Sequence, residues 1–304
     1  GLCLVLAGCA AEEADTPGEA TEKKVAPAPV EALPDGCVPD ETGLCRYFDR
    51  QGRRSLDAHY SDGKLDGAWT AYHGGGEKAS EGQWAGGLQV GAWTYWHHNG
   101  SKRMAGTYSA QGKRDGAWAQ YDTAGTEIGT VTLKQGTGTW REWHDNGQLA
   151  REEQWVDGAR EGRRTEWSSG GQKEIEVEMK AGRRHGTFSA WYGNGQKLAE
   201  HRYAGGEREG GQTDWHANGQ IRSQETWVKG KKDGTWRAWH GDGVLARERG
   251  YAMGKRQGAD RSFFPTGDPK EDSGYVASER DGLWRTWHAT GKQASEERYE
   301  RGRK

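Results

Sequence analysis

Residues 138–148, GTWREWHDNGQ, decide the fold, because their pattern returns along most of the 304-residue chain. We number each copy from its first Gly: aromatic residues follow at positions +2 and +5, and another Gly stands at +9. Position +5 is aromatic and position +17 is apolar in every copy. The first Gly stands at 43, 67, 91, 116, 138, 162, 186, 210, 234, 258 and 282, at spacings of 24 apart from one of 25 and one of 22. Such a period indicates one small unit that buries its apolar surface against its neighbours.

Each copy has the features of a β-hairpin. A short aromatic strand leads into a turn such as Asp145-Asn146-Gly147-Gln148, and a second strand follows. Asn-Gly favours a type I′ turn, in which both central residues have positive φ. A second Gly-bearing turn, as in residues 62–67, joins consecutive copies. We therefore predict an all-β fold, a repeat array of about eleven 24-residue antiparallel β-hairpins that forms an elongated twisted meander sheet.

The turn position also predicts the pairing of the strands. With Asn-Gly at the two turn positions, the first Gly of a copy lies opposite the residue at +17. Side chains at +2 and +5 then point to opposite faces unless a bulge intervenes, so either one face or both carry aromatic ladders. The ladder, as core or as ligand face, comprises Trp69, Tyr72, Trp93, Trp96, Trp118, Tyr121, Trp140, Trp143, Trp167, Trp191, Trp215, Trp236, Trp239, Trp284 and Trp287.

Several copies depart from the pattern. The first has Cys45 at +2, and the copy beginning at Gly258 has Asp260 there. The stretch from Arg261 to Ser278 also holds the two prolines of the repeats, Pro265 and Pro269. Because proline cannot donate to a strand ladder, we expect a kink in this stretch.

The composition limits the classes of partner. Lys and Arg number 43 against 45 Asp and Glu, so no global positive field attracts nucleic acid or an anionic membrane. Leu, Ile, Val and Phe together make up only about a tenth of the chain, well below the roughly 20% typical of folded proteins. The 16 Trp and 11 Tyr nevertheless argue against disorder, so the apolar surface must come from aromatic residues.

The N-terminal residues have the features of an export and anchoring signal. Residues 1–8, GLCLVLAG, form an apolar run too short to span a bilayer and end in small residues before Cys9, like a bacterial lipobox. We interpret residues 1–8 as the remnant of a truncated signal peptide and Cys9 as the lipidated residue. Residues 10–36 are rich in Pro, Ala and Glu and lack aromatics, which predicts a disordered tether. Residues 37–304 are then the repeat domain, and Ala10 after the Cys favours the outer membrane of the cell envelope.

Two further cysteines, Cys37 and Cys45, lie eight residues apart at the entry to the repeats. An exported chain is in an oxidising compartment, so we expect a disulfide between them. Two unpaired thiols are the alternative, and a zinc site is less favoured because no other Cys or nearby His completes a tetrahedron.

The combined motif, Gly-x-Trp-x-x-Trp-x-x-Asn-Gly-Gln followed by an aromatic and a Gly, resembles the bacterial variant of the MORN repeat in proteins of the YwqK-type antitoxin family. Residues 138–148 and the copy that begins Gly234-Thr235-Trp236 match best, and the resemblance covers residues 43–302. It implies an open hairpin array without a catalytic centre, and an antitoxin or immunity role. The chain departs from the motif at position +2, where Arg164, Gln212 and Asp260 stand.

No residue pattern predicts catalysis or a cofactor. Six histidines follow the +5 aromatic, and a metal ladder is one interpretation of them; a half-exposed polar residue before a turn is the favoured one. They are His73, His97, His144, His216, His240 and His288. HExxH, GxSxG and P-loop motifs are absent, so we expect no enzyme, no metal and no cofactor.

Three functional hypotheses follow. The favoured one is an envelope lipoprotein that acts as a repeat scaffold for an unknown protein partner, touching the membrane only through its lipid and binding no nucleic acid. The alternative is binding of cell-wall glycan or choline-type ligands in aromatic cages between repeats. The third is a passive structural spacer. Exposure of the rings discriminates the first two, since a cage needs Trp rings that face water.

Overall fold

The computed structural model describes residues 40–304, which form 24 strands in two open antiparallel sheets. No helix within residues 40–304 is long and apolar enough to cross a membrane. Strands that are neighbours in sequence are neighbours in space, as expected when each hairpin stacks on the next. The predicted all-β hairpin array is confirmed.

The N-terminal sheet has eight strands. They are β1 (Leu44–Phe48), β2 (Arg54–Ser61), β3 (Lys64–Tyr72), β4 (Lys78–Ala85), β5 (Leu88–Trp96), β6 (Lys102–Tyr108), β7 (Arg114–Tyr121) and β8 (Glu127–Leu133).

The C-terminal sheet has 16 strands. They are β9 (Gly138–Trp143), β10 (Leu149–Val156), β11 (Ala159–Trp167), β12 (Lys173–Lys180), β13 (Arg183–Trp191), β14 (Lys197–Ala204), β15 (Glu207–Trp215), β16 (Ile221–Val228), β17 (Lys231–Lys232), β18 (Gly234–Trp239), β19 (Leu245–Ala252), β20 (Lys255–Phe263), β21 (Pro269–Val276), β22 (Glu279–Arg280), β23 (Gly282–Trp287) and β24 (Gln293–Tyr299).

The predicted cross-strand pairing is confirmed. The first Gly of a copy lies opposite the residue at +17, for example Gly91 opposite Tyr108 and Gly186 opposite Tyr203.

The type I′ geometry predicted for the Asn-Gly turns is wrong. At Asn146-Gly147 only the Gly has positive φ, and His144 pairs with Gln148 across a three-residue loop. This is a type I turn followed by a Gly bulge, which Asn-Gly also permits. The two-residue type I′ geometry instead joins consecutive copies, as at Asp62-Gly63, where both residues have positive φ.

The first Gly sits in a bulge in every copy except those that begin at Gly43 and Gly138. In the pairing of β2 with β3, Ala58 lies opposite Trp69 and Tyr60 opposite Leu65, so β3 carries two extra residues around Gly67. Gly67 has a φ of 106°, a conformation that residues with a Cβ rarely adopt. All eleven first glycines have positive φ, which explains why Gly recurs at this position in every copy.

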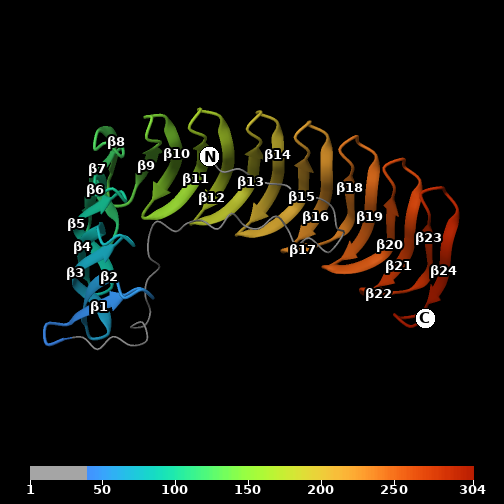
Figure 1. Cartoon of the computed structure of the whole chain (residues 1–304), viewed down its shortest axis with the longest axis horizontal. Coiled ribbons are helices and arrows are strands. Elements are labelled where there is room, and N and C mark those ends of the chain that lie inside the picture. Colours follow the sequence, from blue (N-terminus) through green and yellow to red (C-terminus); the bar gives the residue numbers. More distant parts are fainter. Residues whose placement is uncertain (1–39) are drawn as a thin grey trace.

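A sharp corner separates the two sheets. The inter-repeat turn before Gly138 ends at Gly136, whereas before Gly162 it ends at Gly158, so the copy at 138 lacks the two residues that form the bulge. Between β8 and β9 only an isolated bridge, Lys134 to Thr137, remains. The hairpins from β9 onward then run away from the N-terminal sheet at a steep angle (Figure 1). The single 22-residue spacing therefore marks the corner.

The kink predicted between Arg261 and Ser278 is wrong. Strands β20 and β21 pair in the same register as other hairpins, with Gly258 opposite Tyr275. Pro265 lies in the turn, and Pro269 is the first residue of β21, a position where the missing donor is tolerated.

Candidate binding surfaces

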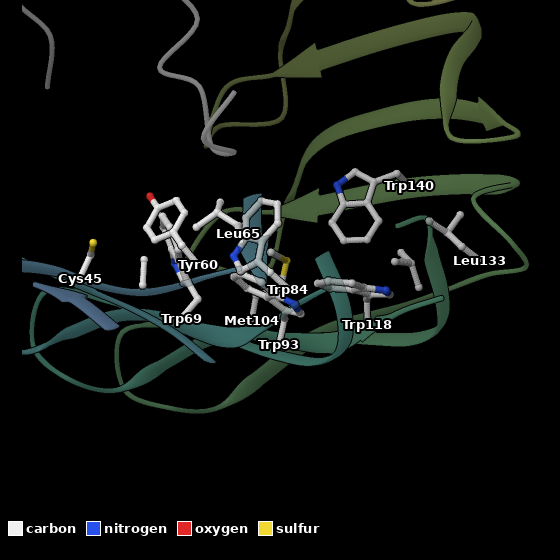
Figure 2. Close-up of a cluster of buried hydrophobic side chains, with 12 residues drawn as sticks. Cys45, Tyr60, Leu65, Trp69, Trp84, Trp93, Met104, Trp118, Leu133 and Trp140 are labelled. Atoms are coloured by element: carbon white, nitrogen blue, oxygen red, sulfur yellow. The ribbon is translucent and has the colours of Figure 1, made fainter. Parts of the chain in front are cut away.

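Rings at +2 and +17 share one face, which we call the core face. In the N-terminal sheet Trp69, Trp84, Trp93, Tyr108 and Trp118 form a continuous zigzag with ring centroids 5.0–6.0 Å apart. Figure 2 shows Trp69, Trp84, Trp93 and Trp118 side by side over the strands. Glycines make space for the indoles: a Cβ on Gly82 would lie 2.2 Å from the Trp93 ring, and one on Gly106 would lie 2.1 Å from the Trp118 ring. These ladder rings are hydrophobic core.

The same core continues across the corner. Trp118 and Trp140 are fully buried, and their rings lie 5.7 Å apart (Figure 2). The Arg114 guanidinium stacks on both rings and on Trp155, at 5.4, 4.0 and 5.6 Å from the three ring centroids. Gln120 Nε2 donates to the Arg141 carbonyl at 2.6 Å, replacing part of the strand ladder that is missing there.

Most rings at +5 lie on the opposite face and are half-buried. The exceptions are Phe48, which is 58% exposed, and Trp143, which packs against the hydrophobic core over Gly129 at the corner. Basic side chains from the preceding copy cover several of them: Arg54 lies 5.0 Å from the Tyr72 centroid, Lys78 lies 5.8 Å from that of Trp96, and Lys197 lies 5.6 Å from that of Trp215. Such contacts shield the ring faces from water. The predicted ladder is thus divided between two faces, and none of the 16 Trp is exposed. Its +2 members on the core face are Trp69, Trp93, Trp118, Trp140, Trp236 and Trp284, and its +5 members are Tyr72, Trp96, Tyr121, Trp143, Trp167, Trp191, Trp215, Trp239 and Trp287.

The core face becomes polar in the C-terminal sheet. Asp260, at a +2 position, is 3% exposed and accepts from Arg247 and Arg249 at 2.9 and 3.1 Å. Glu153, directly opposite Trp140, is 2% exposed and pairs with Arg160 at 3.1 Å. Burying a carboxylate is costly unless it is paired in this way. Sequence analysis noted Asp260 only as a departure from the motif, and it missed Glu153.

One buried polar cluster has the residue types of a hydrolase triad but not its arrangement. Asp214 Oδ1 lies 2.9 Å from His201 Nε2, and its other oxygen accepts from the Ser223 hydroxyl at 2.8 Å. Burial opposes ionisation of Asp214, but the bonds from His201 and Ser223 and the charge of Arg222 outweigh it, so its pKa lies below its usual value. The Ser223 hydroxyl donates to Asp214 and not to His201, so the cluster holds a carboxylate.

Burial and nearby positive groups also have opposing effects on the pKa of Glu142, which lies at the corner. Burial favours its neutral form, but the cross-strand partner Arg151 and the Trp140 indole, which donates at 2.9 Å, reverse the effect. The pKa of Glu142 therefore lies below its usual value.

The histidines after +5 link consecutive copies. The Nε2 atom of His73, His97, His144 and His216 contacts the backbone carbonyl oxygen of the next +5 aromatic at 2.8–3.1 Å. A carbonyl only accepts, so these nitrogens carry the hydrogen. Residues 40–304 hold no group of three or more His, Cys, Asp or Glu placed to bind a metal ion. The geometry supports a linking role for these four residues.

A column of basic residues on the core face was missed by the sequence analysis. We call it the basic stripe: it occupies position −2 of six consecutive copies and consists of Arg160, Arg184, Arg208, Lys232, Arg256 and Arg280. Each residue pairs across the strands with the +17 residue of the preceding copy, as Arg208 does with Tyr203. The 24-residue period makes the stripe visible in the sequence as a basic residue two positions before the first Gly of six copies.

Cys45 is buried and disulfide-bonded. Its predicted partner Cys37, the predicted lipidation site Cys9 and the predicted tether lie outside the described residues.

The fold defines an open β-hairpin repeat protein, and comparison with known proteins agrees at one hairpin. A family profile described as a MORN repeat variant matches residues 137–157, which hold β9 and β10. No curated protein matches the chain.

Solved structures give only a distant likeness. A crystal structure of TcdB2-TccC3 aligns with 81% of this chain and 14% of that chain, at 12% identity and a TM-score of 0.18. The Photorhabdus luminescens Tc holotoxin pore aligns with 80% of this chain and 15% of that chain, at 14% identity and a TM-score of 0.17. The chain thus spans less than a fifth of these toxin components.

Proposed function

We propose that the chain is a non-enzymatic scaffold of the bacterial cell envelope that binds a protein partner across several repeats. In this proposal Cys9 carries a lipid that holds the array at the outer membrane, and residues 10–36 are the tether. An antitoxin or immunity protein of the YwqK type would be one instance of such a scaffold.

The observation that carries the proposal is the long uncovered core face of the C-terminal sheet. This face continues through seven hairpins, and its side chains are mostly half-buried, whereas the N-terminal sheet closes its core face with Trp rings. Repeat arrays with such continuous surfaces serve as extended contact areas for other proteins.

The burial of the rings favours a protein partner over a sugar or choline ligand. An aromatic cage needs pairs of rings open to water, and the ladder rings instead pack on glycines, on each other or under basic side chains. The inverted Ser223–Asp214–His201 cluster likewise favours a non-catalytic role.

Affinity capture tests this proposal. The full chain, extracted in mild detergent, is incubated in parallel with solubilised envelope proteins and with insoluble cell-wall sacculi. We expect one defined envelope protein and no retention on sacculi. Retention on sacculi that choline or a soluble sugar releases would overturn the proposal in favour of the aromatic-cage function.

Replacement of Cys9 tests the anchor. We expect Cys9→Ala to move the chain from the membrane fraction to the soluble fraction, while Cys3→Ala leaves it in place. Equal membrane retention of both variants would contradict lipidation at Cys9.

A further inference from the structure

The basic stripe lies on an aromatic surface. Arg280 sits 3.5 Å from the Trp284 ring centroid, and Arg208 sits 4.9 Å from that of Trp227. Lys232 lies 5.5–5.7 Å from the ring centroids of Trp227, Trp236 and Tyr251. Stacked in this way, the cations are held in a fixed row beside apolar ring edges.

The stripe side chains still have N–H donors that can bind an external anion. Within residues 40–304, neither Arg184 nor Arg280 has a carboxylate oxygen within 4.0 Å; Arg184 contacts the Phe188 and Tyr203 rings, and Arg280 contacts the Trp284 ring and the side chains of Tyr275 and Tyr299. The other four pair with carboxylates: Arg160 with Glu153 at 3.1 Å, Arg208 and Lys232 with Glu225 at 3.5 and 2.9 Å, and Arg256 with Asp260 at 3.9 Å. A guanidinium has five N–H donors, so one carboxylate leaves donors for another acceptor.

The spacing of the stripe residues indicates which backbone conformation a bound acidic chain would have. Its members recur once per hairpin, and two strand spacings of about 4.8 Å place them roughly 9.6 Å apart. A polyproline II helix has 3 residues per turn and rises about 3.1 Å per residue, so every third side chain lies on one face about 9.3 Å apart. A polyproline II chain with an acidic residue at every third position therefore has nearly the same spacing of charges as the stripe.

The rings between the cations fit the same conformation. Polyproline II segments dock in grooves lined by aromatic residues, and the half-buried rings of Tyr203, Trp227 and Tyr251 lie directly opposite successive stripe residues. We infer that the core face of the C-terminal sheet binds an extended Pro-rich segment of a partner protein with an acidic residue at every third position, its carboxylates on the basic stripe and its prolines on the rings.

The N-terminal sheet lacks these features. Its positions equivalent to the stripe are Leu65, which is buried in the core, and Gln89, while Arg114 is enclosed by the corner tryptophans. The binding segment is thus confined to the C-terminal sheet.

Fluorescence anisotropy with the full chain tests the inference. The probe is a labelled peptide of Glu-Pro-Pro triplets, one triplet for each stripe residue. The comparison probes are the same length of Lys-Pro-Pro, a peptide with equal Glu content at every fourth residue, and an oligothymidylate of equal charge. We expect Glu-Pro-Pro to bind most tightly and Lys-Pro-Pro not to bind.

Matched variants locate the site. Arg184→Gln with Arg280→Gln removes two stripe cations that have no carboxylate oxygen within 4.0 Å, and a urea melt verifies that this double variant is folded. Arg183→Gln with Arg298→Gln removes equal charge from the opposite face of the same sheet. We expect the first pair to weaken Glu-Pro-Pro binding by about tenfold or more and the second to leave it within about twofold.

Other outcomes would overturn the inference. They are equal binding of the two glutamate spacings, tighter binding of the oligothymidylate, equal effects of the two variant pairs, or no binding of Glu-Pro-Pro. The inference rests on the scaffold function, but the two fail separately. If Glu-Pro-Pro does not bind while the full chain still captures an envelope protein, only the acidic segment is rejected.

Discussion

At the scale of single residues, the core of the N-terminal sheet depends on Trp rings that pack directly over glycines. Trp93 and Trp118 cover Gly82 and Gly106, where any Cβ would collide with the rings. Where the +2 ring is replaced by Asp260, arginines surround the substituted carboxylate. The same backbone position therefore supports an aromatic core in one sheet and an ionic network in the other.

Ring burial predicts different costs on the two faces. We expect Trp118→Ala, on the core face, to lower the free energy of unfolding by about 3–5 kcal/mol, because it empties a fully enclosed site. Trp215→Ala, on the half-buried opposite face, should cost about 1–2 kcal/mol. Urea denaturation measures both values, and a larger loss for Trp215→Ala would contradict the assignment of faces.

The Asp214 cluster predicts sensitivity to acid. The pKa of Asp214 is lower in the folded than in the unfolded chain, so its stabilising effect is complete above the unfolded pKa of about 3.9 and is lost as pH falls through the folded value. Asp214→Asn should lower the free energy of unfolding at pH 7 and flatten its decrease below about pH 4. Urea melts across this range test the effect; equal slopes for the variant and the parent chain would contradict it.

At the scale of the hairpin, the sequence predicted the unit well and its turns poorly. The 24-residue period and the Gly at +9 were sufficient to predict the strands and the pairing of the first Gly with the residue at +17. Asn-Gly is compatible with both a two-residue and a three-residue loop, so the sequence alone did not decide between them. Position −2 has the same parity as +2, so alternation along the strand already placed the basic stripe on the core face, and the two-residue bulge brings it directly opposite the +17 residue.

The Asn of the turn links hairpins as well as shaping one. Asn194 Oδ1 accepts from the Gln196 amide at 3.0 Å, and its Nδ2 donates to the Ala217 carbonyl of the next copy at 2.9 Å. Asn194→Asp keeps the acceptor and loses the donor, so we expect it to cost about 1 kcal/mol, and Asn194→Ala about 2 kcal/mol. Thermal unfolding compares the two; an Asp variant as stable as the parent would show that the link between copies contributes nothing.

At the scale of the whole molecule, one shortened copy determines the shape. The copy at Gly138 lacks two residues, the ladder stops between β8 and β9, and the array turns (Figure 1). The corner is then fixed by Arg114, Trp118 and Trp140. The 22-residue spacing was visible in the sequence, but only the missing bulge explains its effect.

Restoring the missing residues should straighten the array. Inserting Arg-Glu after Thr137 reproduces the Gly-x-Arg-Glu-Gly segment of residues 158–162. We expect continuous pairing of β8 with β9 and a longer maximum dimension in small-angle X-ray scattering. An unchanged scattering profile would mean that the deletion does not cause the corner.

Site-specific photo-crosslinking most directly tests the central claim, that the chain is a scaffold whose partner lies on the core face of the C-terminal sheet. A photoreactive residue replaces either Arg184, on that face, or Arg183, its neighbour on the opposite face, in the full chain within intact envelopes. We expect a defined crosslinked envelope protein from position 184 and none from position 183. The same adduct from both positions, or from 183 alone, would contradict it.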